Sequence, residues 1–339
     1  MSQPQSILVT GGAGFIGSNF VNMLLDKEPD ITIVNLDSLT YAGNLENLAA
    51  NLDNPRHIFL NGDIREPETV NRAITEYKVD GIINFAAESH VDRSITGPQI
   101  FIETNVSGTL VLLQAALENN IKRFLQISTD EVYGSLGDTG KFREDTPVSP
   151  NSPYSASKTA ADHLVHAYNH TFGLPTVITR CSNNYGPYQF PEKMLPLMFN
   201  NARQDKPLPV YGDGLNVRDW IYVLDHADAI WKVFQEGQVG EVYNVGGDNE
   251  MTNLAVVQLI LQYLDKPESL ITFVKDRPGH DHRYAIDMTR INTELDWHPS
   301  VTFEEGLKRT LDWYSDNGAW LDHVTSGTYQ QYYEKMYGA

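Results

Sequence analysis

The sequence predicts an α/β fold, in which a doubly wound parallel sheet of about seven strands carries a smaller C-terminal lobe. Short runs rich in Val, Ile and Phe alternate with helically spaced apolar residues through the first half of the chain. These runs lack the polar alternation of a half-solvated strand, which indicates a sheet covered on both faces. After about residue 185, prolines and a glycine turn at 212–214 interrupt this rhythm and indicate the second lobe.

Each apolar run is a predicted strand, and the predicted strands are 7–10, 31–37, 57–63, 81–87, 123–129, 176–182 and 241–247. The last run comes after the change in rhythm, so we expect the chain to return to the main sheet. The predicted first domain therefore spans 1–187 with a return at about 221–248. The predicted second lobe spans 188–220 and 249–339.

Composition excludes several classes of protein. The formal net charge is −19 and the pI is about 4.8, which argues against a nucleic-acid or anionic-membrane partner. The single cysteine, Cys181, excludes an internal disulfide and suits a reducing compartment. No unbroken run of about eighteen apolar residues appears, and the N-terminus enters a strand pattern without a secretory signal. We expect a cytoplasmic protein.

A glycine-rich turn joins the first predicted strand to an amphipathic helix. The spacing of Gly11, Gly14 and Gly17 lets backbone amides approach a pyrophosphate at the helix N-terminus, as in Rossmann-type sheets. Asp37 ends the next strand, where an acid accepts hydrogen bonds from an adenosine ribose and repels the 2′-phosphate of NADP. The first domain is therefore predicted to bind NAD.

The other predicted cofactor contacts follow from the topology of this domain. Asp63 ends the third strand near the expected adenine, and residues 85–89 end the fourth near the nicotinamide ribose. The predicted cofactor-binding residues are Gly11, Gly14, Phe15, Ile16, Gly17, Asp37, Ser38, Leu39, Thr40, Asp63, Ile64, Phe85, Ala86, Ala87, Ser89, Thr104, Tyr154, Lys158 and Asn184.

Tyr154 and Lys158 are four residues apart and share one face of a predicted helix. A tyrosine ordinarily ionises near pH ~10, too high for a base at neutral pH. We expect the lysine ammonium and a cationic nicotinamide to lower the pKa of Tyr154 into a working range. This pair after a dinucleotide-binding half resembles the extended short-chain dehydrogenase/reductase family. The resemblance implies that Thr129, at the end of the fifth strand, completes a catalytic triad.

Two adjacent carboxyls, Asp130 and Glu131, follow Thr129. An epimerase needs only hydride transfer and a proton acceptor, whereas a dehydratase also needs a second acid–base pair. Oxidation at C4 of a sugar acidifies C5–H, so one carboxylate removes that proton while a neighbouring carboxylic acid protonates the leaving C6 hydroxyl. Because two close carboxyls do not both ionise freely, the pair supplies one acid and one base.

Ordered matches along nearly the whole chain resemble the dTDP-glucose 4,6-dehydratases, and they lie at 37–45, 88–94, 129–134, 182–187, 192–193, 218–220 and 276–281. The resemblance implies a lyase in which NAD accepts hydride from C4 and returns it to C6, giving a 4-keto-6-deoxy sugar nucleotide. It assigns the C5 base to Glu131 and the C6 acid to Asp130. The predicted catalytic residues are Thr129, Asp130, Glu131, Tyr154 and Lys158.

An anionic sugar nucleotide needs a local basic cluster in so acidic a protein. Turn-rich segments of the second lobe supply Lys193, Arg218, Arg277, His280 and Arg283, although Arg283 fits a scattered surface charge equally well. The predicted substrate-binding residues are Ser89, His90, Thr129, Asn183, Glu192, Lys193, Leu195, Pro209, Tyr211, Arg218, Asn253, Asp276, Arg277, His280 and Tyr284.

The histidines at 163, 166 and 170 fall on one helix without convergent ligands, so we predict no metal site. Helices 99–119 and 154–172 are long, and the first is apolar around most of its circumference. The family resemblance implies that both join a homodimeric four-helix bundle; burial within one chain is the alternative.

Three other functions remain open. A 4,6-dehydratase for a CDP-, UDP- or GDP-linked hexose would share these residues, because the thymine base is inferred from resemblance alone. A nucleotide-sugar 4-epimerase would have no use for Asp130 and Glu131. A non-catalytic NAD sensor would tolerate Tyr154→Phe.

Overall fold

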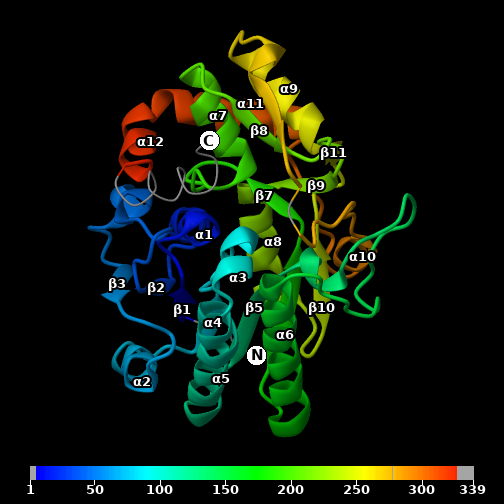
Figure 1. Ribbon diagram of the computed structural model, residues 1–339. Coiled ribbons are helices and arrows are strands. Elements are labelled where there is room, and N and C mark those ends of the chain that lie inside the picture. The colour runs from blue at the N-terminus through cyan, green and yellow to red at the C-terminus, as the bar shows by residue number, and fades with distance from the viewer. Residues whose placement is uncertain (1–4, 277, 327–339) are drawn as a thin grey trace.

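A seven-stranded sheet lies at the centre of the computed structural model, which describes residues 5–276 and 278–326 (Figure 1). In sheet order the strands are β10 (Val242–Val245), β6 (Thr176–Cys181), β5 (Arg123–Thr129), β4 (Gly81–Asn84), β1 (Ser6–Thr10), β2 (Thr32–Asp37) and β3 (His57–Asn61). Every neighbouring pair is parallel, which confirms the predicted doubly wound sheet. The order reverses between β1 and β4, where such sheets bind ligands beyond the carboxyl ends of their strands.

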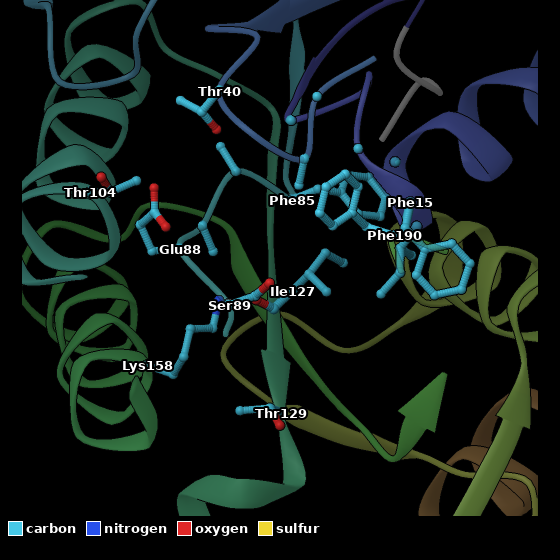
Figure 2. Close-up of a pocket in the computed structure, with 18 of the residues that line it drawn as sticks. Phe15, Thr40, Phe85, Glu88, Ser89, Thr104, Ile127, Thr129, Lys158 and Phe190 are labelled. Carbon is cyan, nitrogen blue, oxygen red and sulfur yellow. The ribbon is translucent and has the colours of Figure 1, made fainter. Parts of the chain in front are cut away.

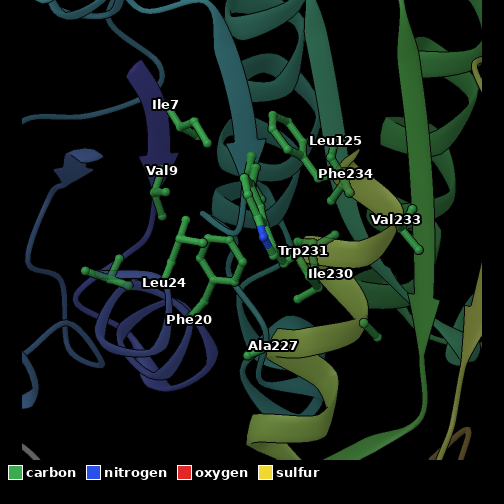
Figure 3. Close-up of a cluster of buried hydrophobic side chains, with 14 of the residues drawn as sticks. Ile7, Val9, Phe20, Leu24, Leu125, Ala227, Ile230, Trp231, Val233 and Phe234 are labelled. Atoms are coloured by element: carbon green, nitrogen blue, oxygen red, sulfur yellow. The ribbon is translucent and has the colours of Figure 1, made fainter. Parts of the chain in front are cut away.

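Helices cover both faces of the sheet. Successive side chains of each strand point to opposite faces, and because both sets are apolar here, both faces have to be buried. Ile7 and Val9 of β1 pack in the apolar layer on one face of the sheet and Leu8 packs in the layer on the other, and these two layers form the first core. Figure 3 shows the first of these layers, where Phe20 and Trp231 pack between their helices and the sheet. The first face carries α1 (Phe15–Lys27), α8 (Val223–Glu236) and α10 (Thr289–Leu295), and the second carries α2 (Pro67–Glu76), α5 (Thr109–Glu118) and α6 (Pro153–Phe172).

The predicted helix 99–119 is built from three joined segments, namely α4 (Gln99–Phe101), the π-helical η2 (Ile102–Gly108) and α5. It packs along α6, and the two lie side by side in Figure 1. Among the described residues, this is the one helical stretch long and apolar enough to cross a membrane, a test that core helices of soluble proteins also pass. Less than half of it is buried within one chain.

A second core lies above the carboxyl ends of the sheet and is built around Tyr185, Phe199, Trp220 and Tyr314. Its strands are β7 (Asn183–Tyr185), β9 (Val217–Tyr222) and β11 (Glu250–Thr252) in one sheet, and β8 (Leu208–Tyr211) and β12 (Ile271–Val274) in another. Its helices are α7 (Met194–Arg203), α9 (Asn253–Tyr263), α11 (Phe303–Asp316) and α12 (Gly318–Val324).

Short helical turns complete the described chain: η1 (Leu45–Asn51), α3 (Val91–Thr96), η3 (Asp130–Tyr133) and η4 (Glu268–Leu270). Of these, η3 follows β5 directly and carries the two predicted acid–base residues. Residue 277 and residues 327–339 of the predicted second lobe lie outside the described residues.

Candidate active site

A cavity of about 320 Å³ opens beyond the carboxyl ends of the central strands. Figure 2 shows Thr40, Phe15 and Phe85 toward one end of it and Lys158 and Thr129 toward the other. The cavity therefore connects the predicted nucleotide-binding turn with the predicted catalytic residues.

The glycine turn forms one wall of the cavity, and its glycines are required sterically. Gly11 has φ +69°, and a Cβ there would lie 2.7 Å from the backbone nitrogen of Ala86. A Cβ on Gly17 would lie 2.3 Å from the carbonyl oxygen of Gly11. Gly14 caps α1 without a side-chain hydrogen bond, so no local side chain competes for the amides of the first turn. This positive helix end fits a pyrophosphate.

Asp37 holds the glycine turn to the loop that follows β2. Its Oδ2 accepts a hydrogen bond from the Ala13 N–H at 2.9 Å, and its Oδ1 accepts from the Leu39 N–H at 2.8 Å. Burial raises the pKa of Asp37, while these two bonds oppose the shift. Each carboxylate oxygen keeps a second lone pair, so the side chain can still accept from a ribose hydroxyl.

Arg65 also lines the cavity, at its adenosine end, and its charge is already balanced. Its guanidinium lies 2.6 Å from Asp63 and 3.3 Å from Glu103. Burial alone would raise the pKa of Asp63, but the hydrogen bonds from Arg65 outweigh it and lower the pKa. Because Arg65 is engaged in this way, the lining fits the ribose of NAD better than the extra phosphate of NADP.

The three residues of the predicted triad meet at the carboxyl end of β5. Lys158 is buried and its Nζ donates a hydrogen bond to the Ile127 carbonyl at 2.7 Å. The Thr129 hydroxyl hydrogen-bonds Tyr154 and accepts from the Glu131 N–H at 3.3 Å. A substrate hydroxyl that enters the cavity would meet Thr129 and Tyr154 together.

The protein's own groups do not lower the pKa of Tyr154, so the expected lowering depends on the cationic nicotinamide. Burial raises it well above 10.0, and the negative charge of Glu131 raises it further. Burial also lowers the pKa of Lys158, whose ammonium is held by a backbone carbonyl. The protein's own groups therefore favour the neutral phenol, because burial disfavours the charged form of each side chain.

Asp130 and Glu131 both line the cavity but differ in burial. Asp130 is 2% exposed; its Oδ1 accepts from the Thr129 hydroxyl at 3.3 Å, and its Oδ2 has no hydrogen-bond partner in the described structure. Burial, followed by the charges of Glu131 and Asp219, raises the pKa of Asp130 well above its usual value. The surroundings of Asp130 therefore favour its carboxylic acid form, whereas Glu131 is half-buried.

The cavity gathers most of the predicted site residues. All five predicted catalytic residues line it, as do all predicted cofactor residues except Leu39. The predicted substrate residues that line it are Ser89, Thr129, Asn183, Glu192 and Lys193. Those that lie outside it are His90, Leu195, Pro209, Tyr211, Arg218, Asn253, Asp276, His280 and Tyr284. Arg277 lies outside the described residues.

Several of the residues outside the cavity contact one another instead. The rings of Tyr211 and His280 lie 6.2 Å apart, and His280 Nδ1 is 2.6 Å from Asp276 Oδ1. The Arg218 guanidinium lies 4.5 Å from the centre of the Tyr284 ring. Leu195 is buried in the second core and presents no polar group to a ligand.

Other lining residues were not predicted from the sequence, and they include Arg65, Glu88, Ile100, Ser128, Cys181, Ser182, Gln189 and Phe190. Ser128, Cys181 and Ser182 stand at the carboxyl ends of β5 and β6, so the rule that ligands bind there could have found them. Burial raises the pKa of Cys181 to about 12, which favours the thiol.

Tyr41 connects the two sides of the cavity. Its ring lies 5.8 Å from Phe190, and the Arg93 guanidinium lies 4.0 Å above it. Arg93 Nε also donates to Glu192 Oε2 at 3.0 Å. We call Tyr41, Arg93, Phe190 and Glu192 the Tyr41 bridge, because they join the loop after β2 to the loop before α7.

Within the described ranges, no group of three or more His, Cys, Asp or Glu side chains is arranged to hold a metal ion. The side chains that line the cavity instead offer carboxyl, phenol, ammonium and hydroxyl groups.

Comparisons with known proteins agree over most of the chain. The family model described as GDP-mannose 4,6 dehydratase matches residues 8–310. The dTDP-glucose 4,6-dehydratase of Xanthomonas campestris pv. campestris (strain B100) is 55% identical over 341 residues, covering 95% of this chain and 97% of that protein.

Two solved structures are similar over the same extent. A dTDP-glucose 4,6-dehydratase from Bacillus anthracis str. Ames, in complex with NAD, has 51% identity and a TM-score of 0.89. The enzyme of the same name from Streptomyces venezuelae, with NAD and TYD bound, has 48% identity and a TM-score of 0.92. Each match covers 94% of this chain and 99% of the other, so the similarity includes the sheet, the cavity and the second lobe.

Proposed function

Because this chain belongs to the dTDP-glucose 4,6-dehydratase family, we propose that it is an NAD-dependent hydro-lyase that converts dTDP-glucose to dTDP-4-keto-6-deoxyglucose and water. The observation that carries the proposal is the pair Asp130 and Glu131 in the cavity that Tyr154 and Lys158 also line. A 4-epimerase would need the tyrosine and lysine but no buried acid beside a second carboxyl.

The cofactor would be held by the glycine turn and by Asp37. The first amides of α1 would bind the pyrophosphate, and Asp37 would accept hydrogen bonds from the adenosine ribose. When bound, NAD supplies the acceptor for the C4 hydride, the donor for C6 and a positive ring charge that favours the Tyr154 phenolate.

Tyr154 and Thr129 act on the C4 hydroxyl. Thr129 orients that hydroxyl and Tyr154 accepts its proton, while Lys158 holds the backbone of Ile127 in place. The resulting C4 ketone makes the proton on C5 acidic, which prepares the sugar for elimination.

Glu131 and Asp130 carry out the elimination. Glu131 removes the C5 proton and Asp130 donates a proton to the C6 hydroxyl, so that C5–H and C6–O break, a C5=C6 double bond forms and water leaves. The raised pKa of Asp130 favours the protonated form that this role needs. When hydride returns to C6, Glu131 returns a proton to C5.

The second lobe (188–220 and 249–339) would bind the rest of the substrate. Ser89, Asn183, Glu192 and Lys193 line the cavity and are proposed to contact the hexose. Arg218, His280 and Tyr211 lie beyond it and are proposed to receive the diphosphate and the base. Lys193 Nζ donates to the Ser89 carbonyl at 2.9 Å, which ties this lobe to the end of β4.

We also propose that the enzyme is a cytoplasmic homodimer whose product enters deoxysugar synthesis, such as that of rhamnose. The incomplete burial of helix 99–118 supports pairing of this helix and α6 with their copies into a four-helix bundle. The single cysteine suits a reducing compartment.

Substrate specificity can be tested by incubating the purified protein with dTDP-, UDP-, CDP- and GDP-hexoses without added reductant. We expect the alkali-induced absorbance of a 4-keto sugar with dTDP-glucose. Reaction with another nucleotide hexose alone would reassign the substrate, and formation of a C4 epimer would reassign the reaction.

Glu131→Gln tests the elimination step. The amide cannot accept the C5 proton, so product formation should fall about 10²- to 10⁴-fold. C4 oxidation should persist, which single-turnover absorbance of the reduced nicotinamide would detect and which also controls for folding. Undiminished product formation would exclude Glu131 as the base.

A further inference from the structure

A buried ion pair that takes no part in the proposed chemistry joins β6 to the catalytic helix α6. Arg180 Nε donates to Asp162 Oδ2 at 3.0 Å, and the two side chains are 8% and 3% exposed. The other oxygen of Asp162 has no hydrogen-bond partner in the described structure. Burying two charges is costly, and apolar pairs in such positions are often equally stable. Stability alone therefore does not explain this pair.

The same guanidinium also contacts Tyr133 of η3. Arg180 Cζ lies 4.8 Å from the centre of the Tyr133 ring, and the two side chains share a hydrogen bond. The Tyr133 hydroxyl donates to Asn244 Oδ1 at 2.8 Å, and its ring stacks on Phe142 at 5.0 Å. Tyr133 is thus held from three sides, and Arg180 is its link to α6.

Arg180 therefore stands between the two elements that carry the proposed catalytic groups. Asp162 is one helical turn beyond Lys158 on α6, and Tyr133 is two residues beyond Glu131 on η3. In the sheet Arg180 pairs with Ser128, the residue before Thr129. We propose that Arg180 is a positioning residue that holds the turn carrying Asp130 and Glu131 in register with the helix carrying Tyr154 and Lys158.

This inference rests on the proposed function, because only a dehydratase needs both elements to act on one bound sugar. Helix α6 has other anchors near its active face, since Lys158 bonds Ile127 and Ser157 accepts from Asn105 at 2.9 Å. The turn η3 is only four residues long. Loss of Arg180 should therefore displace Asp130 and Glu131 more than Tyr154, and should slow elimination more than C4 oxidation.

Arg180→Lys is the direct test, because lysine keeps the charge but lacks the planar fork needed to contact Asp162 and Tyr133 together. Single-turnover absorbance of the reduced nicotinamide reports C4 oxidation, and release of the 4-keto-6-deoxy product reports elimination. We expect the ratio of elimination to oxidation to fall about 10²-fold, as a misplacement of about 1 Å produces. Arg203→Lys, in an arginine–carboxylate pair of the second lobe, should leave this ratio unchanged.

A double variant, Arg180→Met with Asp162→Leu, removes both charges and leaves no unpaired ion in the core, so it should fold even where the single variant does not. The same fall in the ratio is expected, with circular dichroism and the unfolding temperature near those of the unmodified protein. An unchanged ratio in either folded variant, or parallel loss of both steps in Arg180→Lys, would overturn the proposal. In the double variant only the ratio is compared, because the Asp162 charge also raises the pKa of Lys158. Product formation by the unmodified protein tests the proposed function separately.

Discussion

At the scale of single residues, burial gives neighbouring groups of similar chemistry different roles. Asp130 and Glu131 are adjacent in the chain, yet Asp130 is enclosed at the end of β5 while Glu131 is half-buried. Desolvation favours the neutral forms of Asp130, Tyr154 and Lys158 alike. Burial therefore favours the acid form of Asp130, the carboxyl proposed to protonate the C6 hydroxyl.

Asp130→Asn should stabilise the folded protein at neutral pH. Because the folded pKa of Asp130 is raised, the unfolded state loses this proton first as the pH rises above about 4. The unmodified protein then loses stability relative to the variant, by at most about 1.4 kcal/mol per pH unit, until the folded pKa is reached. Denaturant unfolding at pH 4 and pH 7 measures this. A stability difference that is the same at both values would show that Asp130 titrates normally.

At the scale of elements, the cavity is shaped by loops that leave the carboxyl ends of strands. The loop after β2 brings Thr40 and Gly43 to one side, and the loop before α7 brings Phe190 and Glu192 to the other. The Tyr41 bridge is the contact that closes these loops on each other. A cofactor that is reduced and reoxidised within each cycle can stay bound from one cycle to the next. We expect the Tyr41 bridge to slow its release.

Tyr41→Ala should release NAD faster. Losing the ring contacts with Phe190 and Arg93 costs about 1 to 2 kcal/mol, which corresponds to roughly a tenfold faster release. The NAD content after gel filtration and the rate of trapping by an NAD-consuming enzyme measure this. Tyr263→Ala, which removes a tyrosine–carboxylate bond on the far surface of α9, is the matched control. Equal release from both variants would mean that the bridge does not retain the cofactor.

At the scale of the whole molecule, the sheet core and the lobe core lie on either side of one cavity. The stretch 99–118 and α6 also expose apolar side chains to solvent. Ile102 on the stretch 99–118 is 49% exposed and Phe172 at the end of α6 is 54% exposed. In Figure 1 these helices run side by side along one flank. With a net charge of −19, two copies repel at long range, so the proposed dimer would depend on such apolar contacts.

Ile102→Glu should convert the proposed dimer to a monomer, because it places a charge on the apolar face that the two copies are proposed to share. Sedimentation or light scattering would show a halved mass. Leu52→Glu changes a residue of similar exposure near η1 and should leave the mass unchanged. A monomeric unmodified protein would contradict the proposed dimer directly.

Much of the fold could be predicted because its signals are local. Each of the seven predicted strands overlaps a strand of the parallel sheet, since apolar runs of this kind are buried wherever they fold. The glycine spacing identified the turn after β1, and the spacing of Tyr154 and Lys158 placed both on α6. Position at the end of β5 brought Asp130 and Glu131 to the same cavity.

The substrate side was less predictable, because its signals are not local. Arg218 and His280 match motifs, yet they contact other residues of the second lobe, and Phe190 enters the cavity without any motif. The Tyr211 hydroxyl donates to Asp92 Oδ2 of α3 at 3.2 Å. Their positions depend on how the second core packs above the sheet.

The sequence by itself determined the doubly wound sheet, the nucleotide-binding turn and the identity of the catalytic groups, because spacing along a strand or helix sets which side chains share a face. Only the tertiary structure decided that burial raises the pKa of Tyr154, that Asp130 is the more buried of the two carboxyls, and that Arg180 contacts both α6 and η3. The physical reason is that the pKa and the contacts of a buried side chain depend on which distant segments surround it. A local sequence pattern does not specify those segments.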